Sequence, residues 1–132
     1  MKRIVANRKT GEAVVHISGV AGVVETIAIT GAGSDIDEDT GIAGDETVTG
    51  ASINSVTWGS GGAAIGVWKV TRAGNTILIL SNSGSIDFGA MGQAITLDNA
   101  SDIVCTLNGA TEGFLTLELQ KKSTITNDQY LR

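Results

Sequence analysis

The fold is decided by the stretch Gly113-Phe114-Leu115-Thr116-Leu117-Glu118-Leu119-Gln120-Lys121. Its leucines fall on alternate positions, with polar residues between them. Because successive side chains of a β-strand point to opposite faces, this alternation predicts a strand with one buried face and one face in water.

Two further stretches have the same period. Ala13, Val15 and Ile17 alternate with Glu12, Val14 and His16, and Ile103, Cys105 and Leu107 alternate with Asp102, Val104 and Thr106. Along the chain, Gly, Asn, Asp or Ser interrupts such runs roughly every 8–12 residues, which is typical of a sandwich or small barrel. Between Leu107 and Phe114 the sequence predicts a hairpin loop.

The glycine content excludes an extensively helical fold. The chain has 18 glycines in 132 residues, and each costs about 1 kcal/mol relative to alanine inside a helix. We therefore expect an all-β protein, a single-domain antiparallel β-sandwich of jelly-roll-like type with about eight to ten short strands. A domain of this length can bury a substantial core without disulfides.

The ends of the chain differ from its middle. We predict a basic N-terminal arm over residues 1–9, the sandwich domain over 10–122 and a C-terminal tail over 123–132. In the arm, Lys2, Arg3, Arg8 and Lys9 are expected to meet an acidic patch or partner, with a solvated arm as the alternative. In the tail, Ile125, Tyr130 and Leu131 would anchor it on a neighbour.

The run Ile77-Leu78-Ile79-Leu80 is apolar on both faces of a predicted strand. Either this strand crosses the middle of the fold under a loop, or its outer face is covered by another subunit. A continuous exposed apolar strip would promote aggregation. Ile77 and Ile79 are therefore predicted partner contacts, and a homo-oligomer is expected.

Charge and composition disfavour several classes of partner. The net charge is −5, and no Lys or Arg occurs from Thr10 to Trp68, so nucleic acid is not expected as the main partner. No apolar run approaches the roughly 20 residues that span a bilayer, and we expect no membrane partner. With a basic start that lacks a long apolar stretch, and a single cysteine, the sequence favours synthesis in a reducing cytoplasm.

One acidic stretch has the spacing of metal ligands. Against a twelve-residue calcium loop, Asp35, Asp37 and Asp39 fall at positions 1, 3 and 5, and Glu46 falls at position 12. Ca²⁺ is therefore the one cofactor that the sequence suggests. Thr40 stands where that loop needs glycine, so a solvated acidic loop is the alternative.

The sequence offers no catalytic set, and we expect no enzyme. The one histidine, His16, lies in a predicted strand, and Cys105 falls on the inward face of another. The two tryptophans, Trp58 and Trp68, are expected to fill the core. Exposed, they would instead form a platform for stacking sugars.

Several stretches together resemble the small all-β virion proteins of tailed bacteriophages. They are Glu12 to Gly19, Ser55 to Ser60, Ser85 to Gly92, Asp102 to Thr106 and the closing strand Leu115 to Lys122. The resemblance implies a capsid decoration or cement protein, set on the outside of the head shell as a virion component. It further implies the major capsid protein as partner and a trimer as one possible oligomer. The alternative is a carbohydrate-binding β-sandwich module of a head fibre or tail, which would use Trp58, Trp68 or Tyr130 for stacking.

Overall fold

The computed structural model describes residues 1–8, 10–30, 33–38, 46–62, 64–90 and 99–125, and in these ranges it contains nine strands and no helix. The strands are β1 (Lys2–Asn7), β2 (Glu12–Val20), β3 (Val24–Ile27), β4 (Glu46–Gly61), β5 (Val67–Arg72), β6 (Asn75–Ser81), β7 (Gly84–Asp87), β8 (Ile103–Asn108) and β9 (Glu112–Ile125). Within these ranges, the chain has no helix with the length and apolarity needed to cross a bilayer.

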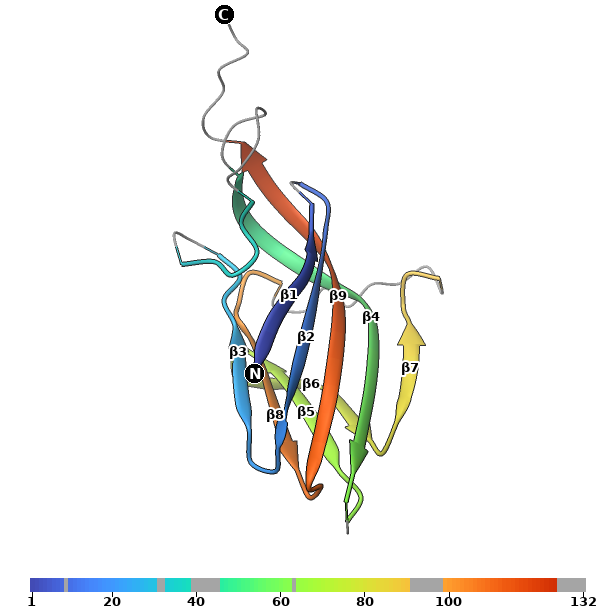
Figure 1. Cartoon of the computed structure of the whole chain (residues 1–132). Helices are drawn as coiled ribbons and strands as arrows, with labels where there is room; N and C mark the ends of the chain where they lie inside the picture. Colours follow the sequence, from blue (N-terminus) through green and yellow to red (C-terminus); the bar gives the residue numbers. More distant parts are fainter. Residues whose placement is uncertain (9, 31–32, 39–45, 63, 91–98, 126–132) are drawn as a thin grey trace, which may run out of the picture.

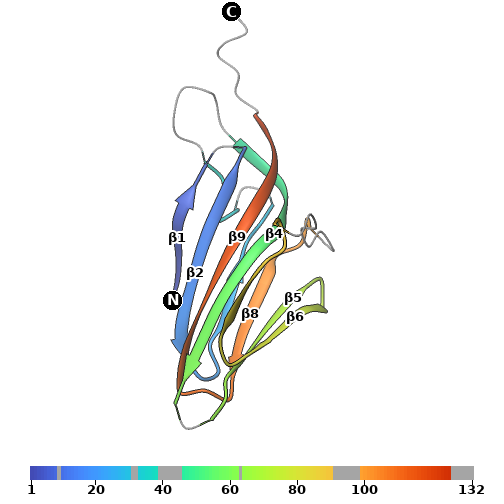
Figure 2. The ribbon, with the colours of Figure 1, turned by 90° about the vertical axis from the view of Figure 1, so that its right-hand side faces the viewer.

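The strands form two antiparallel sheets that face each other (Figures 1 and 2). One sheet has the order β1-β2-β9-β4-β7, and the other has the order β3-β8-β5-β6. This arrangement confirms the predicted all-β, antiparallel sandwich class. The jelly-roll order of connections stays a prediction.

The core lies between the sheets and contains the residues that the alternation selects. Ala13, Val15 and Ile17 of β2, Ile103, Cys105 and Leu107 of β8, and Leu115, Leu117 and Leu119 of β9 are all fully buried. Trp68 is fully buried and Trp58 is 9% exposed. Their indole nitrogens donate to Gly59 O at 3.4 Å and to Ser81 O at 3.0 Å, respectively. The tryptophans therefore fill the core, as predicted, and form no sugar platform.

The longest strand pair joins β4 to β9. The two strands contain 16 and 14 residues and stay paired along almost their whole length. The register shifts between Val48 and Gly50 and again between Ile53 and Ser55. Such bulges bend and twist a strand, which lets the long pair curve over the second sheet.

Three local predictions are wrong in detail. Lys2–Asn7 form the edge strand β1, so most of the predicted arm belongs to the sheet. At the other end, β9 runs to Ile125, past the predicted boundary at residue 122. The segment 108–113 is no hairpin loop, because β8 and β9 lie in different sheets.

The apolar run in β6 lies at an edge of the four-stranded sheet, not at its centre. Leu80 is buried, whereas Ile79 on the opposite face is 67% exposed. Ile77 and Leu78 are half-buried and pack against the core.

Candidate functional site

Three connections between the sheets meet at one end of the sandwich, at the bottom of Figure 1. They follow β2, β4 and β8 and are joined by backbone hydrogen bonds. Ala21 N donates to Thr111 O at 3.2 Å, and Thr111 N donates to Gly61 O at 2.9 Å. The tight turn after β2 is closed by Val23 N donating to Val20 O, and Gly22 has the positive φ of 88° that such a turn demands.

This end is apolar and almost free of charge. We define the apolar end as residues 20–24, 61–62, 64–66 and 109–112. Among the described residues, it carries three of the seven large hydrophobic side chains that are exposed: Val20 at 66%, Val24 at 58% and Ile65 at 69%. Its only charged residue in the described ranges is Glu112. Val20 faces outward from the five-stranded sheet and Val24 faces outward from the four-stranded sheet, so the exposed apolar side chains lie on both sides of this end. Exposed apolar surface of this kind can serve as an interaction surface.

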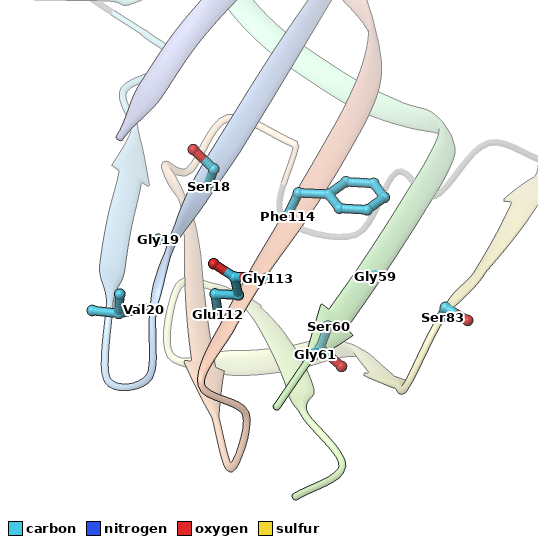
Figure 3. A pocket seen from close by; sticks show the side chains of 10 residues that line it. All are labelled: Ser18, Gly19, Val20, Gly59, Ser60, Gly61, Ser83, Glu112, Gly113 and Phe114. Atoms are coloured by element: carbon cyan, nitrogen blue, oxygen red, sulfur yellow. The ribbon is translucent and has the colours of Figure 1, made fainter. Parts of the chain in front are cut away.

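A groove of about 590 Å³ lies beside the apolar end (Figure 3). Its lining comes from the ends of β2, β9 and β4 and from the turn before β7, and consists of Ser18, Gly19, Val20, Gly59, Ser60, Gly61, Ser83, Glu112, Gly113 and Phe114. We refer to it as the Phe114 groove. Val20, Gly61 and Glu112 belong to both the groove and the apolar end, so the two surfaces are continuous.

Phe114 is held in place by its neighbours. Figure 3 shows its ring extending sideways from β9 across β4. A Cβ atom on Gly59 would lie only 2.5 Å from a carbon of this ring, so the ring rests directly on the glycine. The His16 ring lies nearly parallel to it, with centroids 6.0 Å apart and planes at 18°. Thr116 Oγ1 in turn lies 2.8 Å from His16 Nδ1, which fixes the imidazole.

At the other end of the sandwich, Glu46 and Lys121 form a buried ion pair. Lys121 Nζ lies 2.7 Å from Glu46 Oε1, and both side chains are fully buried. Lys121 also donates to Asn7 Oδ1 at 2.6 Å and to Ile36 O at 3.0 Å. Burial by itself would raise the pKa of Glu46, but hydrogen bonds from Lys121, Ser123 and two backbone amides outweigh it and lower this pKa.

The predicted calcium ligands have protein partners where the structure describes them. Asp35 Oδ2 accepts from Lys2 Nζ and from Ala28 N, both at 2.7 Å, and Asp37 Oδ1 accepts from Val48 N at 3.1 Å. Glu46 is engaged by Lys121. Asp39 lies outside the described residues. Among those residues, no group of three or more His, Cys, Asp or Glu is placed to share a metal ion. The calcium site stays a prediction.

The predicted partner contacts do not form one surface. Lys2 is bonded to Asp35 and to Thr26 O, whereas Arg3 and Arg8 are exposed. These residues lie in or next to edge strand β1, while Ile77 and Ile79 lie on an edge of the other sheet. Lys9, Tyr130, Leu131 and the side chain of Ile125 lie outside the described part of the chain.

The structure separates His16 from Cys105, the one histidine and the one cysteine of the sequence. His16 lies on the outer face of the five-stranded sheet, whereas Cys105 faces the core from the other sheet. Burial, and then the negative charge of Glu25, raise the pKa of the Cys105 thiol to about 12. The thiolate that a cysteine nucleophile needs is therefore suppressed at neutral pH.

Sequence reasoning missed Val20, Val24, Ile65 and Phe114 as surface residues of interest. Two signals were present. The turn Val20-Ala21-Gly22-Val23-Val24 is apolar where turns are usually polar, and Phe114 places an aromatic ring on the wet face of the leucine strand.

Comparison with known proteins gives the chain no family. No protein-family model matches the sequence, and no curated protein matches it. A function therefore has to be inferred from the apolar end and the groove beside it.

Proposed function

We propose that this protein is a non-enzymatic virion structural protein, a capsid decoration or cement protein that binds the outside of a phage head. The observation that carries the proposal is the apolar end, where Val20, Val24 and Ile65 are exposed around the bonded segments that connect the two sheets. The major capsid protein is the proposed partner, and the capsid surface is the proposed location.

The apolar end suits a protein that acts by attachment. Burying a Val or Ile side chain contributes roughly 1.5–3 kcal/mol, so three such side chains can drive docking onto a matching surface. Val20 and Val24 are held in strands, and the connections at this end are bonded to one another, which reduces the entropy lost on binding. Binding that requires neighbouring shell subunits stabilises the assembled shell by mass action.

A homo-oligomer, with a trimer as one option, remains part of the proposal. Ile79, which is 67% exposed on edge strand β6, is its candidate contact. Next to it in the register lies Lys69, also exposed. Ile79, Lys69, Thr106 and Val24 lie in one row across the four-stranded sheet, so the oligomer contact would share a face with Val24 of the apolar end.

Charged substitutions at the apolar end test the attachment. Val24→Asp combined with Ile65→Asp should weaken binding to shells assembled from the major capsid protein at least about tenfold, because interface centres tolerate no unpaired charge. The free energy of unfolding should change by no more than about 0.5 kcal/mol, because both side chains are exposed. Co-sedimentation with shells measures binding, and urea unfolding measures stability.

The matched control is Val5→Asp, at a side chain that is 53% exposed in strand β1. It places the same charge on an exposed valine away from the apolar end, and binding should not change. Equal binding by the wild type and by the Val24→Asp, Ile65→Asp variant would show that the apolar end is not the attachment surface.

A further inference from the structure

We propose that the Phe114 groove is the anchor pocket of this attachment, and that it receives one apolar side chain of a protein partner flanked by a basic residue. The inference rests on the proposed function and deepens it, because it names what the partner presents. The groove lies on the outer face of the five-stranded sheet and opens beside the apolar end.

Glycines of three strands line the groove, but Gly19 and Gly113 are at positions that face the core, so only Gly59 and Gly61 face the groove itself. In the register of β2, β9 and β4, Gly19 pairs with Gly113, and Gly59 pairs with Phe114. Packing explains these three glycines: an added Cβ would lie 2.9 Å from Val23 at position 19, 2.5 Å from the Phe114 ring at 59, and 2.9 Å from Gly59 O at 113.

Gly61 is different. A Cβ atom at this position would meet no atom within 4 Å, and its φ does not lie in the left-handed region. Neither packing nor backbone geometry therefore requires a glycine here. In an exposed strand end, a glycine that the fold does not need weakens the strand. What its absent side chain provides is open space at the end of β4, two residues beyond the glycine on which the Phe114 ring rests.

The chemistry of the lining favours an apolar side chain over a sugar. Its polar side chains are three serines and Glu112, and Ser60 is already bonded to Asn82 O at 3.0 Å. Among the residues that the structure describes, the lining has no Asn, Gln, Asp, Lys or Arg to bind the several hydroxyl groups of a sugar ring. Phe114, 39% exposed, and Val20, 66% exposed, instead offer an apolar wall that continues into the apolar end.

The size and charge of the groove further restrict which side chain can occupy it. A volume of about 590 Å³ lies in the range of small-ligand pockets, so a Trp, Phe or Leu side chain can enter. Buried aromatic anchors of this kind supply most of the energy of many interfaces. Glu112 is the one charged residue in the described part of the lining, so a Lys or Arg beside the anchor is complementary, and an acidic neighbour would be repelled.

Gly61→Val tests the pocket by filling it. The free space around this position means that the fold should tolerate valine, with unfolding changed by no more than about 0.5 kcal/mol. We expect binding to capsid-protein shells to weaken at least about tenfold, since the anchor can no longer enter. The matched control is Ser85→Val, which adds similar apolar bulk to exposed strand β7 of the same sheet outside the groove. Its binding should equal that of the wild type.

A second measurement does not depend on shells. In amide NMR spectra, N-acetyl-tryptophanamide should shift the signals of Gly59 and Gly113 in a saturable manner in the wild type, and these shifts should be lost in Gly61→Val. Methyl α-mannoside and methyl α-glucoside should leave the same signals unchanged.

Three results overturn the inference, and one of them also overturns the proposed function. Shifts with either methyl glycoside but none with N-acetyl-tryptophanamide would make the groove a glycan site. If Gly61→Val binds shells as tightly as the wild type does, the groove is not part of the interface, and the proposed function still stands. A wild-type protein that does not bind shells at all would overturn the proposed function together with the inference.

Discussion

Glu46→Gln should lower the free energy of unfolding by about 3–5 kcal/mol, because it leaves the charge of Lys121 buried without its counter-ion. The two side chains are fully buried and lie 2.7 Å apart. Ser123 Oγ donates to Glu46 Oε2 at 2.6 Å, and Glu38 N donates to Oε1 at 3.0 Å. The carboxylate thus joins β9, the start of β4 and the segment before it. Urea unfolding followed by tryptophan fluorescence measures the loss.

A double substitution separates the effect of losing the ion pair from the effect of leaving the charge of Lys121 buried without a counter-ion. Replacing Glu46 and Lys121 together by methionine should be less destabilising than Glu46→Gln, since no lone charge remains in the core. If the free energy of unfolding of Glu46→Gln lies within about 0.5 kcal/mol of the wild-type value, the ion pair does not stabilise this end of the sandwich.

Acid should lower the free energy of unfolding by protonating the Glu46 carboxylate. Because the pKa of Glu46 is lower in the folded protein than its usual value of 4.5, its contribution is complete above that value and is lost as the pH falls through the folded pKa. The stability difference between wild type and Glu46→Gln should therefore shrink in acid. Glu118 acts in the opposite direction, because burial and then repulsion by Glu12 and Asp87 raise its pKa. Comparing the two proteins at each pH cancels that contribution.

Arg72→Met should also be strongly destabilising, by about 3–5 kcal/mol. Arg72 is fully buried, and its guanidinium donates to Ala51 O at 2.6 Å, to Asn99 O at 2.8 Å, and to Ser101 O at 2.8 and 3.1 Å. It thereby ties β5 in one sheet to β4 in the other and to the turn before β8. Methionine fills much of the space but leaves three carbonyls, one buried and two part-buried, without these donors, at a cost of about 1–3 kcal/mol for a buried one.

Arg72→Lys is the informative control. A lysine keeps the positive charge, but its single ammonium group cannot reproduce the planar fork that spans three carbonyls. It should therefore recover only part of the loss, and amide hydrogen exchange should remain faster at Ala51 and Ser101 than in the wild type. Full recovery by lysine would mean that charge, and not the fork geometry, holds the sheets together at this point.

Local sequence patterns predicted the features that depend only on neighbouring residues of one strand. The alternation in β2, β8 and β9 identified their inward faces, because a period of two follows directly from strand geometry. Which strands pair is a tertiary property. The segment 108–113 has the composition of a hairpin loop, yet it crosses between sheets. Likewise, edge strand β1 is stabilised by its neighbour β2 and has no alternation of its own strong enough to identify it.

The partners of the polar residues likewise could not be predicted from the local sequence. Glu46 has the spacing of a calcium ligand, but the structure pairs it with Lys121, which lies 75 residues further along the chain. The apolar end depends on three connections that are distant in sequence and are joined only by folding. Its apolar turn at Val20 to Val24 was visible in the sequence, whereas the Phe114 groove required the register of three strands.

Quantitative mass spectrometry of purified phage particles tests the central claim, that this protein is a component of the virion shell, most directly. The proposed function predicts the chain in intact, nuclease-treated particles at a fixed molar ratio to the major capsid protein. Particles that lack the chain, while the lysate from which they were purified contains it, would contradict the proposed function.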